Sequence, residues 1–175
     1  MSLPLQSGAG EVQADEMEVK IRGLMMDPVT NMPMVVLKDI GSDALVPIWV
    51  GIFEANAIAL EIEKTATPRP MTHDLLANLI RTLDGEVRRV VITELKDDVF
   101  YALIWMERGG ELISLDARPS DALALALRTD CPIYLSAQVL RTTRMANAGV
   151  ENFSTEDLRR WLENLNDEDL GRYKM

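Results

Sequence analysis

The stretch that most constrains the fold is 114–128, where an apolar run meets a helix-like segment made almost entirely of Ala and Leu. The apolar run ends at Leu115, and the next six positions hold three charged residues: Asp116, Arg118 and Asp121. Ala and Leu are strong helix formers, so we expect a helix from about Ser120 to Thr129. Charge concentrated between two buried elements indicates either a strong helix cap or a functional site.

Alternation of apolar and polar residues predicts several strands elsewhere in the chain. Met17, Val19 and Ile21 alternate with charged residues, which is the period-two pattern of a half-buried strand. Pro47 places the segment 44–50 at a sheet edge or a bulge. We expect strands at 17–24, 34–37, 44–50, 87–95, 99–107, 111–115 and 133–135, and helices at 53–64, 73–83, 120–129 and 137–145. The predicted fold class is α+β, a single compact domain with a mixed or antiparallel sheet and packed helices.

A weak internal repeat accompanies this pattern. Three expected strands and a helix over 17–64 are matched by three strands and a helix over 87–129. At an offset of 65 residues, Asn56 aligns with Asp121. The similarity is slight, so duplication of a β-β-β-α unit stays open, and the α+β prediction does not depend on it.

The two ends of the chain differ in composition from its centre. Residues 1–16 lack periodicity and nearly all bulky apolar side chains, so we expect a disordered leader. The domain itself is expected over 17–145. Residues 146–175 are expected to form a C-terminal helical extension and an acidic tail.

Cysteine content and charge restrict the compartment and the partners. The single Cys131 cannot form an internal disulfide, which favours the reducing cytoplasm, and no apolar run is long enough to span a membrane. The net charge of −10 does not support binding to nucleic acid, which would require Arg residues gathered locally. A generous apolar content of 47%, with Trp49 on a strand expected at an edge, predicts a homo-oligomer.

Two expected helix starts share one pattern, Arg-Pro followed by a hydroxyl residue and an acid. The first is 69–74 and the second is 118–121. Helix capping explains both, because Pro suits the first turn, Ser or Thr satisfies an open N–H group, and an acid there complements the helix dipole. The arginine of each motif would then pair with a carboxylate.

A functional interpretation rests on the combination of the two motifs. His73 is the only histidine, and its neighbours are polar, so it can serve as a general base or a metal ligand. Carboxylates at element ends can hold Mg²⁺ or Mn²⁺, and arginines can bind a phosphate through two hydrogen bonds. The candidate catalytic residues are His73, Asp74, Asp116 and Asp121; the candidate metal ligands are Glu54, Asp116 and Asp121; the candidate substrate-binding residues are Arg69, Arg118, Thr72 and Ser120. The same set of residues also suits a buried ion-pair network, and spacing alone does not show that the groups converge.

Several separated segments together resemble the bifunctional nuclease domain family. They are Pro47-Ile48-Trp49-Val50-Gly51 followed by Glu54-Ala55, Arg69-Pro70-Met71-Thr72-His73-Asp74-Leu75, Asp116-Ala117-Arg118-Pro119-Ser120-Asp121-Ala122, Leu125-Ala126-Leu127-Arg128, and Pro132-Ile133-Tyr134. The resemblance covers roughly 17–142. It implies a compact α+β fold, self-association, and DNase and RNase activity of the kind that gave the family its name, without an agreed set of catalytic residues.

Two functions therefore remain open at this point. One is a metal-assisted nuclease of low sequence specificity that cleaves DNA, RNA or both. The other is a non-catalytic oligomeric scaffold or a regulator that binds a small ligand, in which the same residues form caps and ion pairs.

Overall fold

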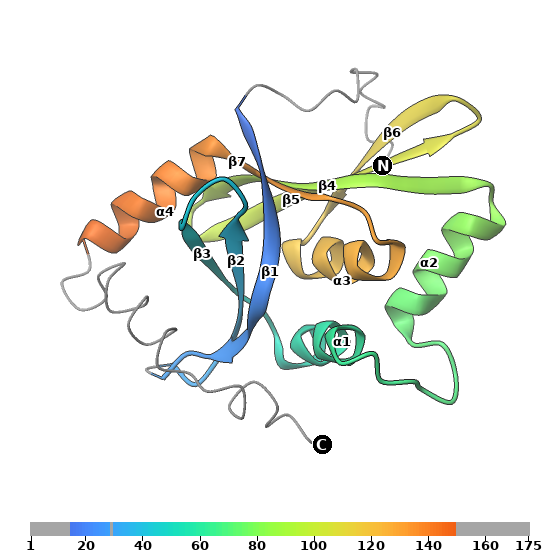
Figure 1. Cartoon of the computed structure of the whole chain (residues 1–175), viewed down its shortest axis with the longest axis horizontal. Helices are drawn as coiled ribbons and strands as arrows, with labels where there is room; N and C mark the ends of the chain where they lie inside the picture. The colour runs from blue at the N-terminus through green and yellow to red at the C-terminus, as the bar shows by residue number, and fades with distance from the viewer. Residues whose placement is uncertain (1–14, 29, 150–175) are drawn as a thin grey trace.

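The computed structural model describes residues 15–28 and 30–149, with side chains placed as far as Thr143, and arranges them as one seven-stranded sheet with four helices (Figure 1). The strands are β1 (Glu16–Met26), β2 (Pro33–Asp39), β3 (Leu45–Trp49), β4 (Gly85–Lys96), β5 (Val99–Arg108), β6 (Glu111–Ala117) and β7 (Ile133–Ser136). The helices are α1 (Ile52–Ile62), α2 (Thr72–Thr82), α3 (Pro119–Thr129) and α4 (Ala137–Gly149). Every element expected over 17–145 is present, which confirms the α+β prediction, and α4 continues to Gly149, four residues beyond its expected end.

The sheet has the strand order β3-β2-β1-β7-β4-β5-β6, with β7 between two antiparallel three-stranded units. β7 pairs antiparallel with β1 and parallel with β4, so the sheet is mixed, and β1 and β4 run in opposite directions. Each three-stranded unit is followed by a helix that starts directly after its edge strand. The observed order therefore contains the β-β-β-α unit twice, with α2 inserted between the two copies.

The alignment of the two units differs from the sequence offset. At the offset of 65, Asn56 aligned with Asp121, but both Glu54 and Asp121 occupy the third position of their helices, α1 and α3. The connection from β3 to α1 is longer than the connection from β6 to α3, and this shifts the register between strands and helices. Glu54 is therefore the structural counterpart of Asp121.

Helix α3 is the centre of the core. It contacts α1, α2, β4 and β5, and the five consecutive residues 122–126 are all buried. A helix enclosed on most sides needs apolar residues around most of its circumference, which explains its Ala/Leu composition. Small Ala side chains let α1 and the sheet approach closely, while Leu123 and Leu125 fill the space between the layers. In Figure 1, α4 and α2 lie at opposite ends of the molecule.

The ends of the strands follow their local sequence. Pro47 lies in β3, which is an edge strand, so its missing N–H group costs no ladder hydrogen bond, as predicted. Asp97 and Asp98 both have positive φ and form the two-residue turn between β4 and β5. Gly109 and Gly110 do the same between β5 and β6.

Two predictions concern segments that lie largely outside the described residues. These are the disordered leader, 1–16, and the C-terminal extension and tail, 146–175. Across the part of the chain that is described, no helix combines the length and the apolar content that crossing a membrane would require.

Candidate functional site

The first turns of α1, α2 and α3 are tied together by charged side chains. Each of these helices carries an acid at its third position: Glu54, Asp74 and Asp121. Negative charge is favourable there because the N-terminal end of the helix dipole is positive. All three acids are bound by arginine, two of them by Arg118 and the third by Arg128.

Arg118 joins the first turns of α1 and α3. Its Nε and Nη2 atoms donate to the two carboxylate oxygens of Asp121 at 2.7 and 3.0 Å, and Nη1 donates to Oε1 of Glu54 at 2.8 Å. Hydrogen bonds from Arg118 to these two carboxylates raise its already high pKa, so it stays a cation. Three of the five N–H groups of the guanidinium are used. The other two have no partner among the described residues, and the side chain is 64% exposed.

His73 in the first turn of α2 reaches the same carboxylate. Its Nε2 atom lies 3.0 Å from Oδ1 of Asp121, and its side chain is 12% exposed. Burial opposes ionisation of Asp121, but the hydrogen bonds from Arg118 and His73 outweigh it and hold the pKa of Asp121 below its usual value. The structure thus joins His73, Asp121, Arg118 and Glu54 in one continuous network.

Arg128, in the last turn of α3, forms a second tie. Its Nε donates to Asp74 at 2.5 Å, while Nη1 and Nη2 donate to the carbonyl oxygens of Ala124 and Ala57. The hydrogen bond from Arg128 is the main reason that the pKa of Asp74 lies below its usual value, and the Met71 N–H group adds to the effect. The sequence interpretation did not assign Arg128 a role. Its position as a cation at the end of an almost wholly apolar helix is the signal by which the sequence could have identified it.

The helix caps differ from those expected. Thr72 was predicted to cap α2, but Met71 is the capping residue, and its N–H group donates to Asp74 at 2.8 Å. The Asp74 carboxylate therefore satisfies the N–H group of the capping residue itself, and the Thr72 hydroxyl group does not cap the helix. Ser120 lies inside the first turn of α3, after Arg118 as cap and Pro119, and it is buried.

A pocket of about 360 Å³ opens beside Arg118. It lies where β3, the first turn of α1, the β4–β5 turn and the first turn of α3 meet. Its lining residues are Ile48, Trp49, Val50, Gly51, Glu54, Asp98, Val99, Phe100, Arg118, Pro119 and Ser120. Of the predicted site residues, Glu54, Arg118 and Ser120 line the pocket. Asp121, which binds Arg118, and His73, which binds Asp121, do not line it.

Gly51 explains how Glu54 reaches its position. A Cβ atom on Gly51 would lie 2.2 Å from Oε2 of Glu54, so the carboxylate is folded back over the start of its own helix. Only glycine leaves that space without displacing Glu54. Oε1 accepts from Arg118, and Oε2 is left beside Gly51 at the edge of the pocket.

Asp116 is not brought to this network. Its neighbour Ala117 pairs with Ala102 of β5, and Ala102 belongs to the core that packs against α3. Because successive residues of a strand point to opposite faces, Asp116 points to the face of the sheet away from α1, α2 and α3. It is exposed, and within the described residues its carboxylate has no hydrogen-bond or ion-pair partner.

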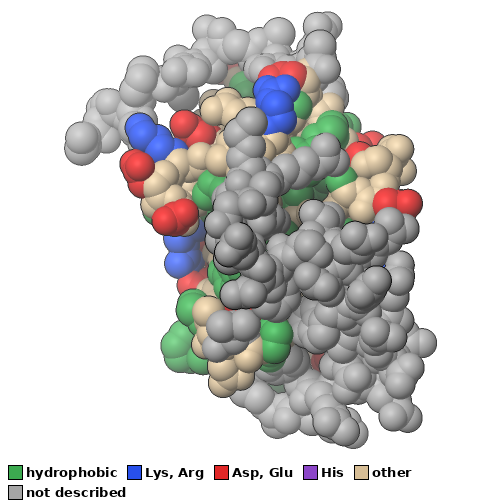
Figure 2. All heavy atoms as spheres, turned by 90° about the vertical axis from the view of Figure 1, so that its left-hand side faces the viewer, with side chains coloured by type: hydrophobic (Ala, Val, Ile, Leu, Met, Phe, Trp, Pro, Cys, Tyr) green, Lys and Arg blue, Asp and Glu red, His purple; other side chains and the backbone are tan. Residues whose placement is uncertain are grey.

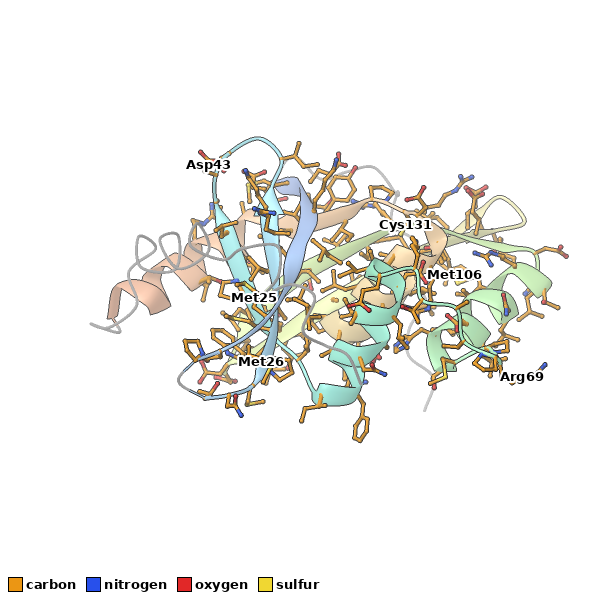
Figure 3. All side chains as sticks on the ribbon, turned by 60° about the horizontal axis from the view of Figure 1, so that its bottom comes forward. Met25, Met26, Asp43, Arg69, Met106 and Cys131 are labelled. Carbon is orange, nitrogen blue, oxygen red and sulfur yellow. The ribbon has the colours of Figure 1, made fainter. Side chains whose placement is uncertain are left out.

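Arg69 and Thr72 also stand apart from the pocket. Arg69 is exposed in the loop before α2, and Figure 3 shows its side chain pointing away from the body of the molecule. Thr72 is exposed at the first position of α2. The structure therefore does not place two arginines around one phosphate.

The charges of the described surface agree with the acidic composition. On the face drawn in Figure 2, the Lys and Arg side chains that are coloured lie among Asp and Glu side chains and form no continuous basic patch. In the described part of the chain, no three His, Cys, Asp or Glu side chains are grouped closely enough to hold a metal ion. Glu54 and Asp121 are the only two of the three predicted ligands that share a neighbour, Arg118.

Comparison with known proteins finds relatives of this chain. An uncharacterised protein of Mycobacterium tuberculosis is 41% identical over 123 residues, which cover 70% of this chain and 73% of that protein. Bifunctional nuclease 1 of Oryza sativa is 29% identical over 118 residues, covering 66% of this chain. Bifunctional nuclease 1 of Arabidopsis thaliana is 28% identical over 108 residues, covering 59%.

The chain spans about a third of each of these two plant proteins, 36% and 33%. The sequence profile described as the bifunctional nuclease domain matches residues 35–148, a range that includes the whole Glu54–Arg118–Asp121–His73 network. The chain belongs to the bifunctional nuclease domain family.

Proposed function

We propose that this protein is a nuclease that hydrolyses phosphodiester bonds in DNA, RNA or both at the pocket beside Arg118. The observation that carries the proposal is that Arg118 lines the pocket and that two N–H groups of its guanidinium have no partner among the described residues. Plant relatives in the same family are named bifunctional nucleases. Arginine binds phosphate well because its planar N–H groups match the oxygens of the anion.

The residues of the network take different roles in this reaction. Arg118 binds the scissile phosphate, and the N–H groups at the start of α3 add a favourable dipole. Oε2 of Glu54 accepts a proton from water, whose oxygen attacks phosphorus as the P–O ester bond breaks, and the leaving oxygen takes a proton from solvent water. Asp121 and His73 do not line the pocket, so they act as positioning residues that hold Arg118 in place. We assign no role in the pocket to Asp74, which is bound to Arg128, or to Asp116.

A divalent cation, Mg²⁺ or Mn²⁺, would help the phosphate to bind near this group of charges. The network holds two carboxylates and one guanidinium, so a phosphate approaching it meets repulsion that a cation would reduce. Glu54 and Asp121 are the residues that would hold such an ion. Because both are bound to Arg118 and no third ligand is grouped with them among the described residues, we assign no reaction step to the ion.

The test is cleavage of single-stranded and double-stranded substrates by the purified protein with Mg²⁺ or Mn²⁺. Arg118→Ala is expected to reduce cleavage at least 100-fold. His73→Ala is expected to reduce it about 10-fold, since it loosens the support of Asp121. Arg88→Ala is the matched control, because Arg88 also binds two carboxylates, Glu86 and Glu107, and is exposed.

Arg88 lies near the open end of the β4–β5 hairpin, about 30 Å along the strand from the turn at the pocket. Its variant should keep full activity. Cleavage that is absent from the wild type, or that Arg118→Ala leaves unchanged, would refute the proposal.

A second function is favoured by a separate observation on α2. Met71, Leu75, Leu79 and Leu83 recur at every fourth position and are all exposed. Such a stripe suits packing against a second copy, as in a non-catalytic oligomeric scaffold or a ligand-binding regulator in the cytoplasm. Oligomers by light scattering, with no cleavage, would favour this function; a monomer at micromolar concentration would contradict the predicted homo-oligomer.

A further inference from the structure

Trp49 is an exposed aromatic residue among those that line the pocket. It is the last residue of the edge strand β3, lines the pocket, and is 45% exposed. Exposure leaves the ring accessible to a ligand, and its position beside the pocket distinguishes Trp49 from the other exposed apolar residues.

The orientation of this ring is fixed by a buried acid. Nε1 of Trp49 donates to Oδ2 of Asp27 at 2.9 Å. The Thr30 hydroxyl group donates to the same oxygen at 2.8 Å, and Asp27 is only 8% exposed. The polar atom of the indole is therefore satisfied inside the protein, and a ligand at the pocket meets an oriented apolar ring.

The lining of the pocket combines two chemistries. One part of its lining is apolar, from Trp49, Val99 and Phe100, and the other contains Arg118 and the start of α3. An aromatic surface beside an arginine with N–H groups to spare fits a ligand that carries both a flat ring and a phosphate. A nucleotide within a strand has this composition.

The pairing state of the base decides whether it can use this surface. Inside a duplex, the faces of each base are covered by its neighbours, so the indole ring cannot stack on them. In a single strand the bases are exposed, and an aromatic side chain can stack on any of them because every base has a π-face.

We propose that Trp49 stacks on an unpaired nucleobase while Arg118 binds the adjacent phosphate, so that the pocket takes single-stranded nucleic acid. The inference rests on the proposed function for the role of Arg118. It adds a residue that selects the substrate, and it explains recognition without a basic surface, since stacking supplies affinity that an acidic protein does not gain from charge.

The test is binding of a fluorescent single-stranded 12-mer of DNA with a non-cleavable phosphorothioate backbone, beside the duplex of the same sequence. Trp49→Leu removes the ring and Trp49→Phe keeps an aromatic ring; both lose the hydrogen bond to Asp27. We expect Trp49→Leu to weaken single-strand binding about 5- to 100-fold, and Trp49→Phe to weaken it much less. Duplex binding should be weak and the same in all three proteins.

The comparison of Leu with Phe separates stacking from any loss of folding, which thermal unfolding of each variant also checks. Equal single-strand affinity of Trp49→Leu and wild type, equal losses in both variants, or no single-strand binding at all would overturn the inference. If the wild type binds through Trp49 but cleaves nothing, the proposed function fails and the inference stands. If Trp49→Leu cleaves single strands and duplexes in the same ratio as wild type, the inference fails and the proposed function stands.

Discussion

At the scale of single residues, the position of Glu54 depends on an atom that Gly51 lacks. A Cβ at Gly51 would stand 2.2 Å from Oε2 of Glu54, so Gly51→Ala must push the carboxylate away by about 1 Å. The backbone of Gly51 has φ −70°, which alanine adopts without strain. We expect a free energy of unfolding within about 0.5 kcal/mol of wild type, but cleavage reduced 10- to 100-fold because the proposed base is misplaced.

Gly41→Ala is the matched control for this variant. A Cβ there meets no atom closer than 3.8 Å, so nothing has to move. Cleavage rates and urea denaturation of both variants make the comparison. Full activity of Gly51→Ala would show that the position of Glu54 does not matter to the reaction.

The acids of the helix starts also predict how stability depends on pH. Arg128 lowers the pKa of Asp74 in the folded protein, whereas in the unfolded chain the pKa of this carboxyl group returns to about 3.9. A lowered folded pKa means that the stabilisation is complete above pH 4 and is lost as the pH falls through the folded value. Asp121 adds a contribution of the same sign, from its bonds to Arg118 and His73.

We therefore expect Asp74→Asn to lower the free energy of unfolding by about 1–3 kcal/mol at pH 7. Urea denaturation between pH 3 and pH 7 measures this difference. It should shrink towards the acid end as the wild-type carboxylate becomes protonated. A difference that stays constant over the whole range would contradict the assigned ion pair.

At the scale of elements, Arg128 holds three helices together. Its side chain is 6% exposed, and its guanidinium binds Asp74 of α2, the carbonyl of Ala57 in α1, and the carbonyl of Ala124 in its own helix. Arg128→Met keeps the length of the side chain but leaves Asp74 and the Ala57 carbonyl without their donor. We expect a loss of about 2–4 kcal/mol in the free energy of unfolding, measured by urea denaturation.

An exposed arginine gives the comparison for this loss. Arg88→Met removes two ion pairs at the surface and should cost less than about 1 kcal/mol. Equal losses in the free energy of unfolding for the two variants would mean that Arg128 does not stabilise the packing of the three helices. Arg128→Lys should fall between wild type and Met, since one ammonium group cannot reach all three acceptors.

The elements themselves could be predicted from sequence because each has a strong local signal. Alternation located the strands, and Ala/Leu content located α3, although its apolar pattern could not say which neighbours enclose it. The helix caps were less predictable: Asp74, rather than the hydroxyl group of Thr72, binds the open N–H group of α2. Thr72 and Asp74 are two residues apart and both could bind an open N–H group, and which of them does so depends on local geometry that the spacing does not reveal.

Convergence of the site was predictable in part. The helix-start motifs suggested that His73, Asp121 and Arg118 act together, and the structure brings them into hydrogen-bond contact. Asp116 belongs to the same sequence motif, but strand alternation turns it to the other face of the sheet. Glu54 joins this group through a hydrogen bond from Arg118, which lies 64 residues later in the chain, and the sequence alone does not show such a contact.

At the scale of the whole molecule, the sheet relates its two halves by an approximate two-fold arrangement around β7. The β-β-β-α units place the starts of α1 and α3 beside each other, and Arg118 bridges their equivalent acids, Glu54 and Asp121. The pocket therefore lies where two copies of one structural unit meet. The group of two carboxylates and one guanidinium is negative, as is the chain, whose net charge is −10.

Because the chain is acidic and only one arginine lines the pocket, the salt dependence of binding shows how many phosphates the protein contacts. A protein that neutralises Z phosphates of a single strand shows a slope of log K against log salt of about −0.7Z. With Arg118 as the one arginine that lines the pocket, we expect a slope between about −0.5 and −1.5 for the non-cleavable single strand. A protein that binds through a basic surface of six contacts would give about −4.

Titrations at several KCl concentrations with constant Mg²⁺ measure this slope. Arg118→Ala should bring it close to zero, whereas Arg88→Ala should leave it unchanged, because Arg88 is occupied by two glutamates far from the pocket. Trp49→Leu should reduce affinity at every salt concentration without altering the slope, since stacking releases no counterions. A slope steeper than about −3, or one that Arg118→Ala does not change, would place the phosphate contacts on another surface of the protein.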